Sequence, residues 1–425
     1  LSSSFTCNPS SFGMASSAAI ARYEGRTLVI FGAPDRSIGA KLGSGRLFAL
    51  DAATGAQVWA SPELARLTGS GGNDLHEQFG YSAPVVHGDA VYIGIADHCD
   101  NPIQSGRVVG VSLAGGTPLS GFGFSATPNG PRGGGVWSSV AAGLSGGGLY
   151  VTTGNSNIGG PEPRPNHGLS LLRLDQTTGA LSWKLQPVPY AMDLDPDWAS
   201  GASLLSSSCG ELALSTMKDG WAYAATAAGA PPGANVRWQF PTFGLPFVPG
   251  DGSVHGDSRY LVPGAAWHDI FFTMAGGELL TQEPTFTGGG LPPQLFPGFG
   301  KLHALNTCAG PGGRVRWIVD VPSVAPDAAY QLGPPTVTRG IVYVGTAAGH
   351  LVAVADPTRW PSTDSRCART DIPKSLCVAN GYPLVPVPKV LLDLPLNAGD
   401  IKSEPVLAGA RVFVATTGGV LVALT

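Results

Sequence analysis

The chain has 425 residues, of which 43% are apolar and only 13% are charged, with 61 Gly, 37 Pro and a formal net charge of −4. This composition excludes a disordered chain and allows a large core with many tight turns. The Lys and Arg residues are dispersed, so no basic surface for nucleic acid is indicated, and no apolar run reaches the length of about eighteen residues that could span a bilayer.

Short apolar runs rich in Val, Thr and Gly, with little repetition at helical spacing, indicate an all-β protein built from many short strands. One pattern repeats along the chain. It consists of an apolar strand, a hairpin into a second strand of the type V-Y-x-G, a third strand of the type G-x-L-x-A-L-D, and then T-G-x-x-x-W. The cleanest third and fourth strands are residues 45–51 and 54–59.

Seven such units start near residues 15, 81, 137, 198, 265, 334 and 403. A ring of sheets buries each sheet face against a neighbour, which a single four-stranded sheet cannot do. We therefore predict one domain over residues 1–425, a seven-bladed (alternatively eight-bladed) β-propeller of four-stranded antiparallel blades. The seventh unit lacks a fourth strand, so we expect the N-terminal strand at residues 1–7 to close the ring.

Four tryptophans recur at one place in the unit, and we interpret them as wedges between adjacent blades: Trp59, Trp183, Trp238 and Trp317.

The six cysteines form no C-x-x-C pair, which argues against a zinc site. Cys367 and Cys377 flank a short loop and could form a disulfide, as in exported proteins. The chain begins at Leu1 without Met, as expected if a signal peptide has been removed. We therefore predict a periplasmic or secreted protein.

The pattern G-x-L-x-A-L-D-x-x-T-G-x-x-x-W resembles the repeat of the quinoprotein propellers, the family of alcohol dehydrogenases that depend on pyrroloquinoline quinone (PQQ). Scaffold propellers of the bacterial outer-membrane assembly machinery share the repeat without being enzymes, so the fold alone does not give the function. Residues 133–223 carry a more specific resemblance, to the cofactor-binding blades of methanol, ethanol and polyvinyl-alcohol dehydrogenases.

The resemblance implies roles for four residues. Trp137 matches the tryptophan that lies flat against the quinone, and Asn155 matches an amide ligand of the calcium ion. Asp197, in Asp-Trp-Ala-Ser-Gly, matches the catalytic base that takes the alcohol proton. Lys218 falls where the family has a cation at the quinone carbonyl, which stabilises the charge of the reduced cofactor.

A further calcium ligand is expected from the preceding blade, and Asp97 is our first choice, with Asp100 second. Asp97, Asn155 and Asp197 would supply the oxygen ligands that calcium prefers. Lanthanide-using relatives have an extra Asp where this chain has Ala199, which favours calcium. Arg36 matches an arginine that holds a carboxylate of the cofactor.

The chain departs from the larger enzymes, because it has no adjacent cysteine pair, no haem domain and only seven units. It is most similar to the compact polyvinyl-alcohol-dehydrogenase-like branch.

Each of the four residues also has a possible structural role. Trp137 could be another wedge, Asn155 could cap a turn, and Lys218 could belong to a hairpin turn. Asp197 could lie in a solvated acidic loop, and the register of its assignment is uncertain by two residues.

The leading hypothesis is an oxidoreductase that uses PQQ and calcium to oxidise an alcohol or polyol, either a small molecule or a polymer. Electrons would pass to an external acceptor such as a cytochrome c. The alternative is a cofactor-free propeller that acts as an exported binding or scaffold protein.

Overall fold

The computed structural model describes residues 14, 17–35, 44–65, 78–80, 82–97, 105–128, 133–143, 145, 147–155, 167–187, 197–198, 200–218, 221–227, 236–241, 263–275, 301–321, 333–358, 360–368 and 374–425. The chain divides into two compact units, Leu1–Ala202 with Gly229–Asn235 and Ser203–Ala228 with Val236–Thr425, and each unit is treated by itself. In the described ranges no helix has the length and apolar character needed to cross a membrane.

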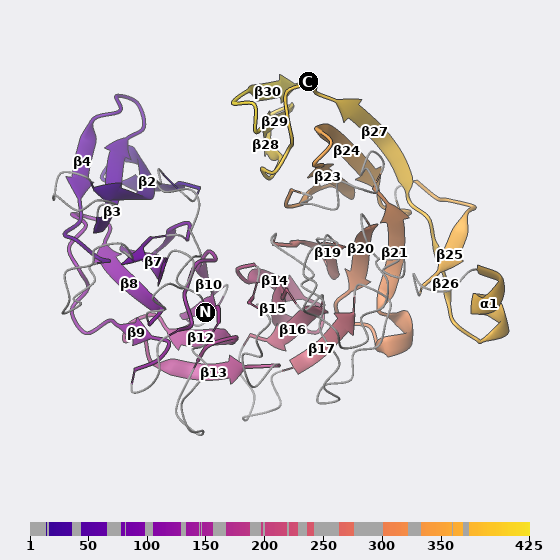
Figure 1. The fold of residues 1–425 in the computed structure, drawn as a ribbon, viewed down its shortest axis with the longest axis horizontal. Coiled ribbons are helices and arrows are strands. Elements are labelled where there is room, and N and C mark those ends of the chain that lie inside the picture. The colour runs from indigo at the N-terminus through magenta and orange to yellow at the C-terminus, as the bar shows by residue number, and fades with distance from the viewer. Residues whose placement is uncertain are drawn as a thin grey trace, which may run out of the picture. The chain divides into compact units, whose positions relative to one another are not determined.

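The first unit contains three antiparallel sheets, coloured indigo to magenta in Figure 1. The first sheet has the strands β1 (Ala19–Tyr23), β2 (Arg26–Asp35), β3 (Ser44–Asp51) and β4 (Gln57–Ala60). The second has β5 (Gln78–Phe79), β6 (Val85–His87), β7 (Ala90–Asp97), β8 (Arg107–Ser112) and β9 (Phe124–Ser125). The third has β10 (Ala141–Ala142), β11 (Gly148–Thr152), β12 (Leu171–Asp175) and β13 (Leu181–Leu185). Because β5 and β6 both pair with β7, they take the place of a single first strand.

Among the described residues, the second unit contains four further blade sheets, besides a two-stranded sheet described below. They are formed by β14 (Ser203–Ser207), β15 (Gly210–Thr216), β16 (Trp221–Thr226) and β17 (Val236–Pro241); by β18 (Ala265–Trp267), β19 (Ile270–Ala275), β20 (Lys301–Asn306) and β21 (Val315–Asp320); by β22 (Thr336–Thr338), β23 (Ile341–Gly345), β24 (His350–Ala355) and β27 (Lys389–Pro395); and by β28 (Val406–Ala408), β29 (Arg411–Ala415) and β30 (Leu421–Leu424). A 3-10 helix, η3 (Pro311–Gly313), lies between β20 and β21. Helix α1 (Lys374–Ala379) and the hairpin β25 (Ser365–Cys367) and β26 (Leu384–Pro386) are inserted between β24 and β27.

These sheets follow the seven predicted repeats in order, and the prediction of an all-β propeller with seven antiparallel blades is confirmed. We number the sheets as blades one to seven along the chain. Blade seven has three strands among the described residues. The predicted closing strand at residues 1–7 lies outside the described residues and stays a prediction.

Consecutive blades within a unit share their apolar cores. Ile30 and Leu47 of blade one pack in one cluster with Ile93 of blade two. Phe272 of blade five lies in the same cluster as Val352 of blade six. Every second residue of a strand points to the same face, so each strand contributes apolar side chains to the cores on both sides. This sharing allows short sheets to bury both of their faces.

Each of three repeat tryptophans donates its indole N–H to the next blade. Nε1 of Trp59 lies 2.9 Å from the carbonyl oxygen of Leu113, and Nε1 of Trp238 lies 2.8 Å from the carbonyl oxygen of Thr307. Nε1 of Trp317 lies 2.7 Å from Oδ2 of Asp356. Each acceptor is the first residue after the third strand of its blade. The interpretation of these tryptophans as wedges is confirmed, and the role of the fourth, in β13, stays a prediction.

The Asp-x-x-Thr-Gly turn between the third and fourth strands is closed by the aspartate side chain. Oδ1 of Asp51 accepts hydrogen bonds from the backbone N–H and the hydroxyl of Thr54, at 2.9 and 3.0 Å. Gly55 follows with a φ of 72°, a backbone conformation that glycine adopts without strain. The same bonds recur between Asp175 and Thr178. The repeated sequence motif therefore encodes a turn, independently of any catalytic role.

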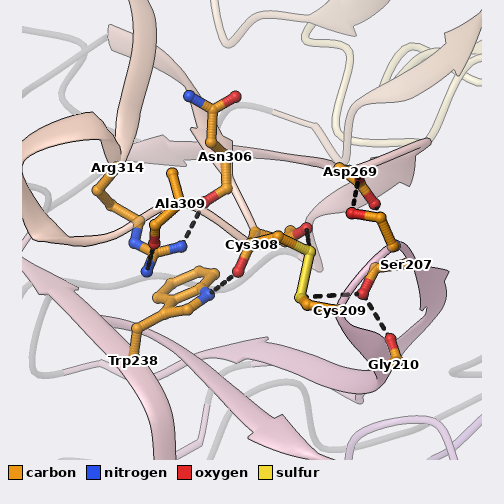
Figure 2. The surroundings of a disulfide bond; sticks show 11 residues. Ser207, Cys209, Gly210, Trp238, Asp269, Asn306, Cys308, Ala309 and Arg314 are labelled. Atoms are coloured by element: carbon orange, nitrogen blue, oxygen red, sulfur yellow. Dashed lines mark hydrogen bonds between the residues drawn. A yellow bond between two sulfur atoms is a disulfide. The ribbon is translucent and has the colours of Figure 1, made fainter.

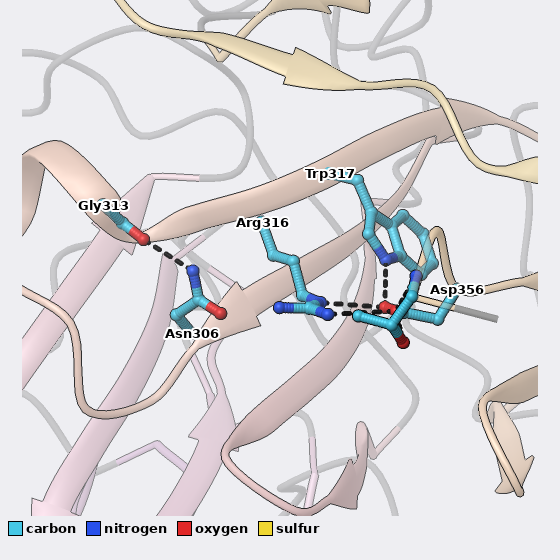
Figure 3. A network of polar contacts seen from close by, with 6 residues as sticks. Asn306, Gly313, Arg316, Trp317 and Asp356 are labelled. Atoms are coloured by element: carbon cyan, nitrogen blue, oxygen red, sulfur yellow. Dashed lines mark hydrogen bonds and ion pairs between the residues drawn. The ribbon is translucent and has the colours of Figure 1, made fainter. Parts of the chain in front are cut away.

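Asp356 combines a turn cap with an ionic link between blades five and six (Figure 3). Its fully buried carboxylate accepts hydrogen bonds from Nε and Nη2 of Arg316, at 2.9 and 3.0 Å, and from the indole of Trp317. Thr358 adds its backbone N–H and hydroxyl. Burial favours the neutral acid, but the donors of Arg316, Thr358 and Trp317 outweigh it and hold the pKa of Asp356 well below its usual range.

A disulfide joins blades four and five, between Cys209 in the β14–β15 turn and Cys308, the second residue after β20 (Figure 2). Beside it, the guanidinium of Arg314 lies 4.5 Å from the ring centroid of Trp238. The second disulfide, Cys367–Cys377, is the one that the sequence indicates. All four cysteines in the described ranges are paired.

We expect Asp356→Asn to lower the free energy of unfolding by about 3 kcal/mol at pH 7, because the substitution leaves the half-buried Arg316 without its counter-charge. Since the folded-state pKa is depressed, this stabilisation is present above the ordinary carboxyl pKa near 3.8 and fades as the pH falls through the folded-state value. Urea unfolding at pH 7 and pH 3 measures both effects. The exposed Asp364→Asn is the control, and equal losses in the two variants would contradict the assignment.

The Cys209–Cys308 disulfide closes a loop of 99 residues. Replacing both cysteines by serine is expected to cost about 4–5 kcal/mol, because the unfolded chain regains the entropy of that loop. The matched control replaces Cys367 and Cys377, whose separation is only 10 residues, and is expected to cost about 3 kcal/mol. Chemical unfolding of the two double variants tests this order, and a reversed order would show that local packing dominates.

Candidate functional site

The candidate site lies in the first unit, where the chain passes from blade two to blade three. A segment outside the strands, residues 133–137, runs beside the ends of β7 and β11. The N–H of Val136 donates to the carbonyl oxygen of Ile95 at 3.2 Å, and the N–H of Gly154 donates to that of Gly135 at 2.9 Å. The N–H of Gly134 donates to the carbonyl oxygen of Asn155 at 2.5 Å. These backbone hydrogen bonds therefore connect the segments that carry three predicted site residues. The residues are Asp97 at the end of β7, Trp137 and Asn155.

Gly154 is the point where Trp137 and Asp197 meet. A Cβ atom placed on Gly154 would lie 2.9 Å from Oδ1 of Asp197 and 3.1 Å from Nε1 of Trp137. The carboxylate oxygen and the indole nitrogen therefore lie no farther apart than the sum of these distances. Asn155 is the next residue along the chain. The structure thus brings together three of the residues predicted for one site, from sequence positions 137, 155 and 197.

The segment that carries Asp197 is fixed to blade three by its backbone. The hydroxyl of Thr152, the last residue of β11, donates to the carbonyl oxygen of Ser200 at 2.9 Å. Gly201 approaches Ser139 so closely that an added Cβ would lie 2.3 Å from the Ser139 carbonyl oxygen. These two contacts place Asp197 over Gly154. Asp197 therefore has a defined position although it lies outside the strands.

The polar atoms of the site are shielded from water. Asp197 is 6% exposed, and Oδ1 of Asp197 and Oδ1 of Asn155 are both buried atoms. Trp137 is only half-buried, unlike the repeat tryptophans. No cluster of three or more His, Cys, Asp or Glu residues that could hold a metal occurs within the described ranges. A metal bound here would rely on the amide oxygen of Asn155 as well as on carboxylates.

His167 adjoins the site from the other side of the strand end. Its carbonyl oxygen accepts a hydrogen bond from the hydroxyl of Thr153 at 2.5 Å, and its ring stacks on Phe124 with the centroids 5.9 Å apart. Burial, aided by the positive charge of Lys184, lowers the pKa of His167 below its usual value. Burial therefore favours the neutral form of this imidazole.

The remaining predicted residues are not joined to this set. Lys218 directly follows Met217 at the end of β15, is 8% exposed and belongs to the second unit, so its place at the site stays a prediction. Asp97 ends β7, but its side chain lies outside the described part of the structure. Arg36 and Asp100 also lie outside the described residues.

The sequence did not single out Gly154 and Thr152, two of the residues that position the site. Both lie in Thr-Thr-Gly-Asn, directly before the predicted ligand Asn155. A glycine next to a predicted ligand was the available signal, since it allows another chain segment to approach the backbone closely.

A scan against protein-family models and a search of curated protein sequences found no match. Among solved structures, a europium-containing methanol dehydrogenase is 15% identical, with 94% of this chain and 72% of that chain covered and a TM-score of 0.60. A quinohemoprotein alcohol dehydrogenase from Pseudomonas putida HK5 is 16% identical, with coverages of 93% and 61% and a TM-score of 0.58. BamB from Moraxella catarrhalis is 13% identical, with coverages of 96% and 82% and a TM-score of 0.53.

At these identities the likeness shows a shared fold, and the fold is that of a β-propeller found in quinoprotein dehydrogenases and in BamB. The chain spans less than two thirds of the quinohemoprotein. Because one fold hosts unrelated functions, the activity has to be argued from the site.

We expect Gly154→Ala to displace Asp197 from Trp137, because the new methyl group would overlap the carboxylate oxygen. The cost in unfolding free energy is expected to be about 1–3 kcal/mol, as for other overpacked sites. Thermal unfolding measures the cost, and a crystal structure of the variant locates Asp197. Gly123→Ala is the matched control, since a Cβ there meets nothing within 4 Å. Equal stability of the two variants would contradict the close approach.

Proposed function

We propose that this protein binds PQQ and a calcium ion at the site around Gly154 and oxidises an alcohol or polyol, passing the electrons to an external acceptor such as a cytochrome c. The observation that supports this most strongly is the meeting of Trp137 and Asp197 at Gly154, next to Asn155. The same residues are those that the family resemblance implies. The fold shared with a methanol dehydrogenase and an alcohol dehydrogenase is consistent with the proposal.

The donor chemistry of the site suits calcium. Calcium prefers six to eight oxygen ligands, from carboxylates, amides, backbone carbonyls and water. Asp197 offers a carboxylate and Asn155 an amide oxygen. Both Oδ1 atoms are buried, and Oδ1 of Asp197 lies close to the backbone of Gly154. We propose Asp97 as the third protein ligand, with Asp100 as the second choice. Nitrogen and sulfur ligands, which would favour zinc, have no place in this set.

The chain also offers the groups that a planar, anionic quinone requires. Trp137 presents an indole that the core does not cover completely, and an aromatic face suits stacking on a flat ring. We propose that Lys218 contacts a cofactor carbonyl and that Arg36 holds a cofactor carboxylate. When bound, PQQ would supply the two-electron acceptor that the side chains of a protein lack.

Asp197 is the residue proposed to act on the substrate. A carboxylate in a site shielded from water is a suitable base for the hydroxyl proton of an alcohol, because little solvent competes for its oxygen. The backbone contacts at Thr152 and Gly201 hold this carboxylate in place, so no rearrangement is needed before proton transfer. Asp197 would therefore receive the proton at the carboxylate oxygen that does not bind the calcium ion.

We further propose that the protein works outside the cytoplasm, in the periplasm or as a secreted protein. The two disulfides support this, because stable disulfides are rare in the reducing cytosol.

An absorbance titration with PQQ in calcium buffer tests the proposal, followed by a dye-linked assay with a panel of alcohols. We expect saturable binding in the micromolar range that Asp197→Asn and Asn155→Ala each weaken by about 10- to 100-fold, since the first replaces a charged oxygen ligand by a neutral one and the second removes an oxygen ligand. A chelator should have the same effect as the two substitutions. Asp197→Asn should also abolish dye reduction, because an amide does not accept the proton.

The matched control is Asp89→Asn, an exposed residue of the same unit, which should bind PQQ like the original protein. Absence of binding at micromolar PQQ, or equal binding by Asp197→Asn and Asp89→Asn, would reject the proposal. That outcome would favour the alternative of a cofactor-free binding or scaffold propeller, whose partner a pull-down experiment would then identify.

A further inference from the structure

Two buried polar side chains lie opposite each other in blade five, outside the site described above. Thr273 of β19 and His303 of β20 are direct partners in the antiparallel register, and each is 1% exposed. Within the described residues, Oγ1 of Thr273 and Nδ1 of His303 have no hydrogen-bond partner. Buried polar atoms of this kind are costly unless something satisfies them, so the pair requires an explanation.

Both side chains face blade four. Thr273 is two residues from Phe271 along β19, and His303 is two residues from Leu305 along β20, so the four side chains share one face of the sheet. Phe271 and Leu305 pack in one core cluster with Trp238 of blade four. Thr273 and His303 are therefore the next cross-strand pair in the interface between blades four and five.

The facing residues of blade four are mostly small. The ring of Phe240 meets that of His303 edge-on, with the centroids 6.1 Å apart. Phe240 lies opposite Ala222, which in turn lies opposite Thr216 in the adjacent strand. The preceding row consists of Leu214, Ala224 and Trp238. This row has Thr216, Ala222 and Phe240, so a third buried hydroxyl replaces a leucine and a phenylalanine replaces the tryptophan. The row is therefore both more polar and less bulky than the row before it.

The group that satisfies this pair should be small and uncharged. Burial, with a contribution from the charge of Lys301, lowers the pKa of His303 to about 3, while a backbone hydrogen bond at Lys301 and the charge of Asp320 oppose the shift. The imidazole is therefore neutral in the physiological range and faces a neutral hydroxyl. An ion would lose its hydration here without gaining a counter-charge. A water molecule can instead donate a hydrogen bond to Nδ1 of His303 and form a second one with the hydroxyl of Thr273.

We propose that Thr273 and His303 form an internal binding site for one water molecule between blades four and five. The water would join Nδ1 of His303 to Oγ1 of Thr273 and give each atom its missing partner. The site would lie at the level of Thr216, two residues along the chain from Lys218. The proposal does not depend on the identity of the cofactor or on any catalytic activity.

The sign of the effect of Thr273→Val tests the proposal, because valine has the shape of threonine without the hydroxyl. If the site holds water, the substitution removes one anchor of that water and lowers the melting temperature by about 2–4 °C. If the site is dry, the substitution removes an unsatisfied buried hydroxyl, and the melting temperature stays the same or rises. A constant or raised melting temperature overturns the proposal.

The control is Thr346→Val in the same unit. The hydroxyl oxygen of Thr346 accepts a hydrogen bond from the backbone N–H of His350 at 3.1 Å, so loss of this hydroxyl must lower the melting temperature. Should Thr273→Val fail to fold, a crystal structure of the original protein at about 1.5 Å decides the question. Density for an oxygen about 2.7–3.2 Å from both Nδ1 and Oγ1 supports the proposal, and its absence at that resolution overturns it.

Discussion

The fold depends on one recurring contact, in which an indole N–H of a fourth strand reaches the residue directly after the third strand of the next blade. A four-stranded sheet is too small to be stable with an exposed apolar face, so each blade needs its neighbour. Trp59 and Trp238 meet backbone carbonyl oxygens, whereas Trp317 meets the carboxylate of Asp356. The same position therefore accepts either a neutral or a charged partner, and the charged one recruits Arg316 as a counter-ion.

Because the strands are occupied with this packing, the candidate site is built from the connections between them. Trp137 and Asp197 lie outside the strands, and Asn155 lies three residues beyond the end of β11. Their positions depend on how closely chain segments approach one another, and Gly154 permits that approach. A rigid set of blades with residues presented from their ends is a common way to locate binding groups without weakening a core.

The sequence was sufficient for the fold because its signals are local and repeat. The aspartate that closes a turn with Thr54 and the tryptophan that follows are a few residues apart, so their pattern predicts each blade. The Cys367–Cys377 disulfide spans 10 residues and was predictable for the same reason, whereas Cys209–Cys308 spans 99 residues and depends on which strand ends meet in space. At the site, the sequence predicted the residues with chemical groups but missed Gly154, whose role appears only when position 197 is placed beside it.

The positions of the polar residues separate structural roles from candidate functional ones. Asp51, Asp175 and Asp356 all occur at the end of a third strand, where the repeat places a turn, and their hydrogen bonds close that turn. Asp197 occupies no position of the repeat and lies in a connection that is fixed by its neighbours. Trp137 likewise stands outside the series of wedges and remains half-exposed. Because the repeat does not require these two residues, the proposed function depends on them more directly than on the aspartates that close the turns.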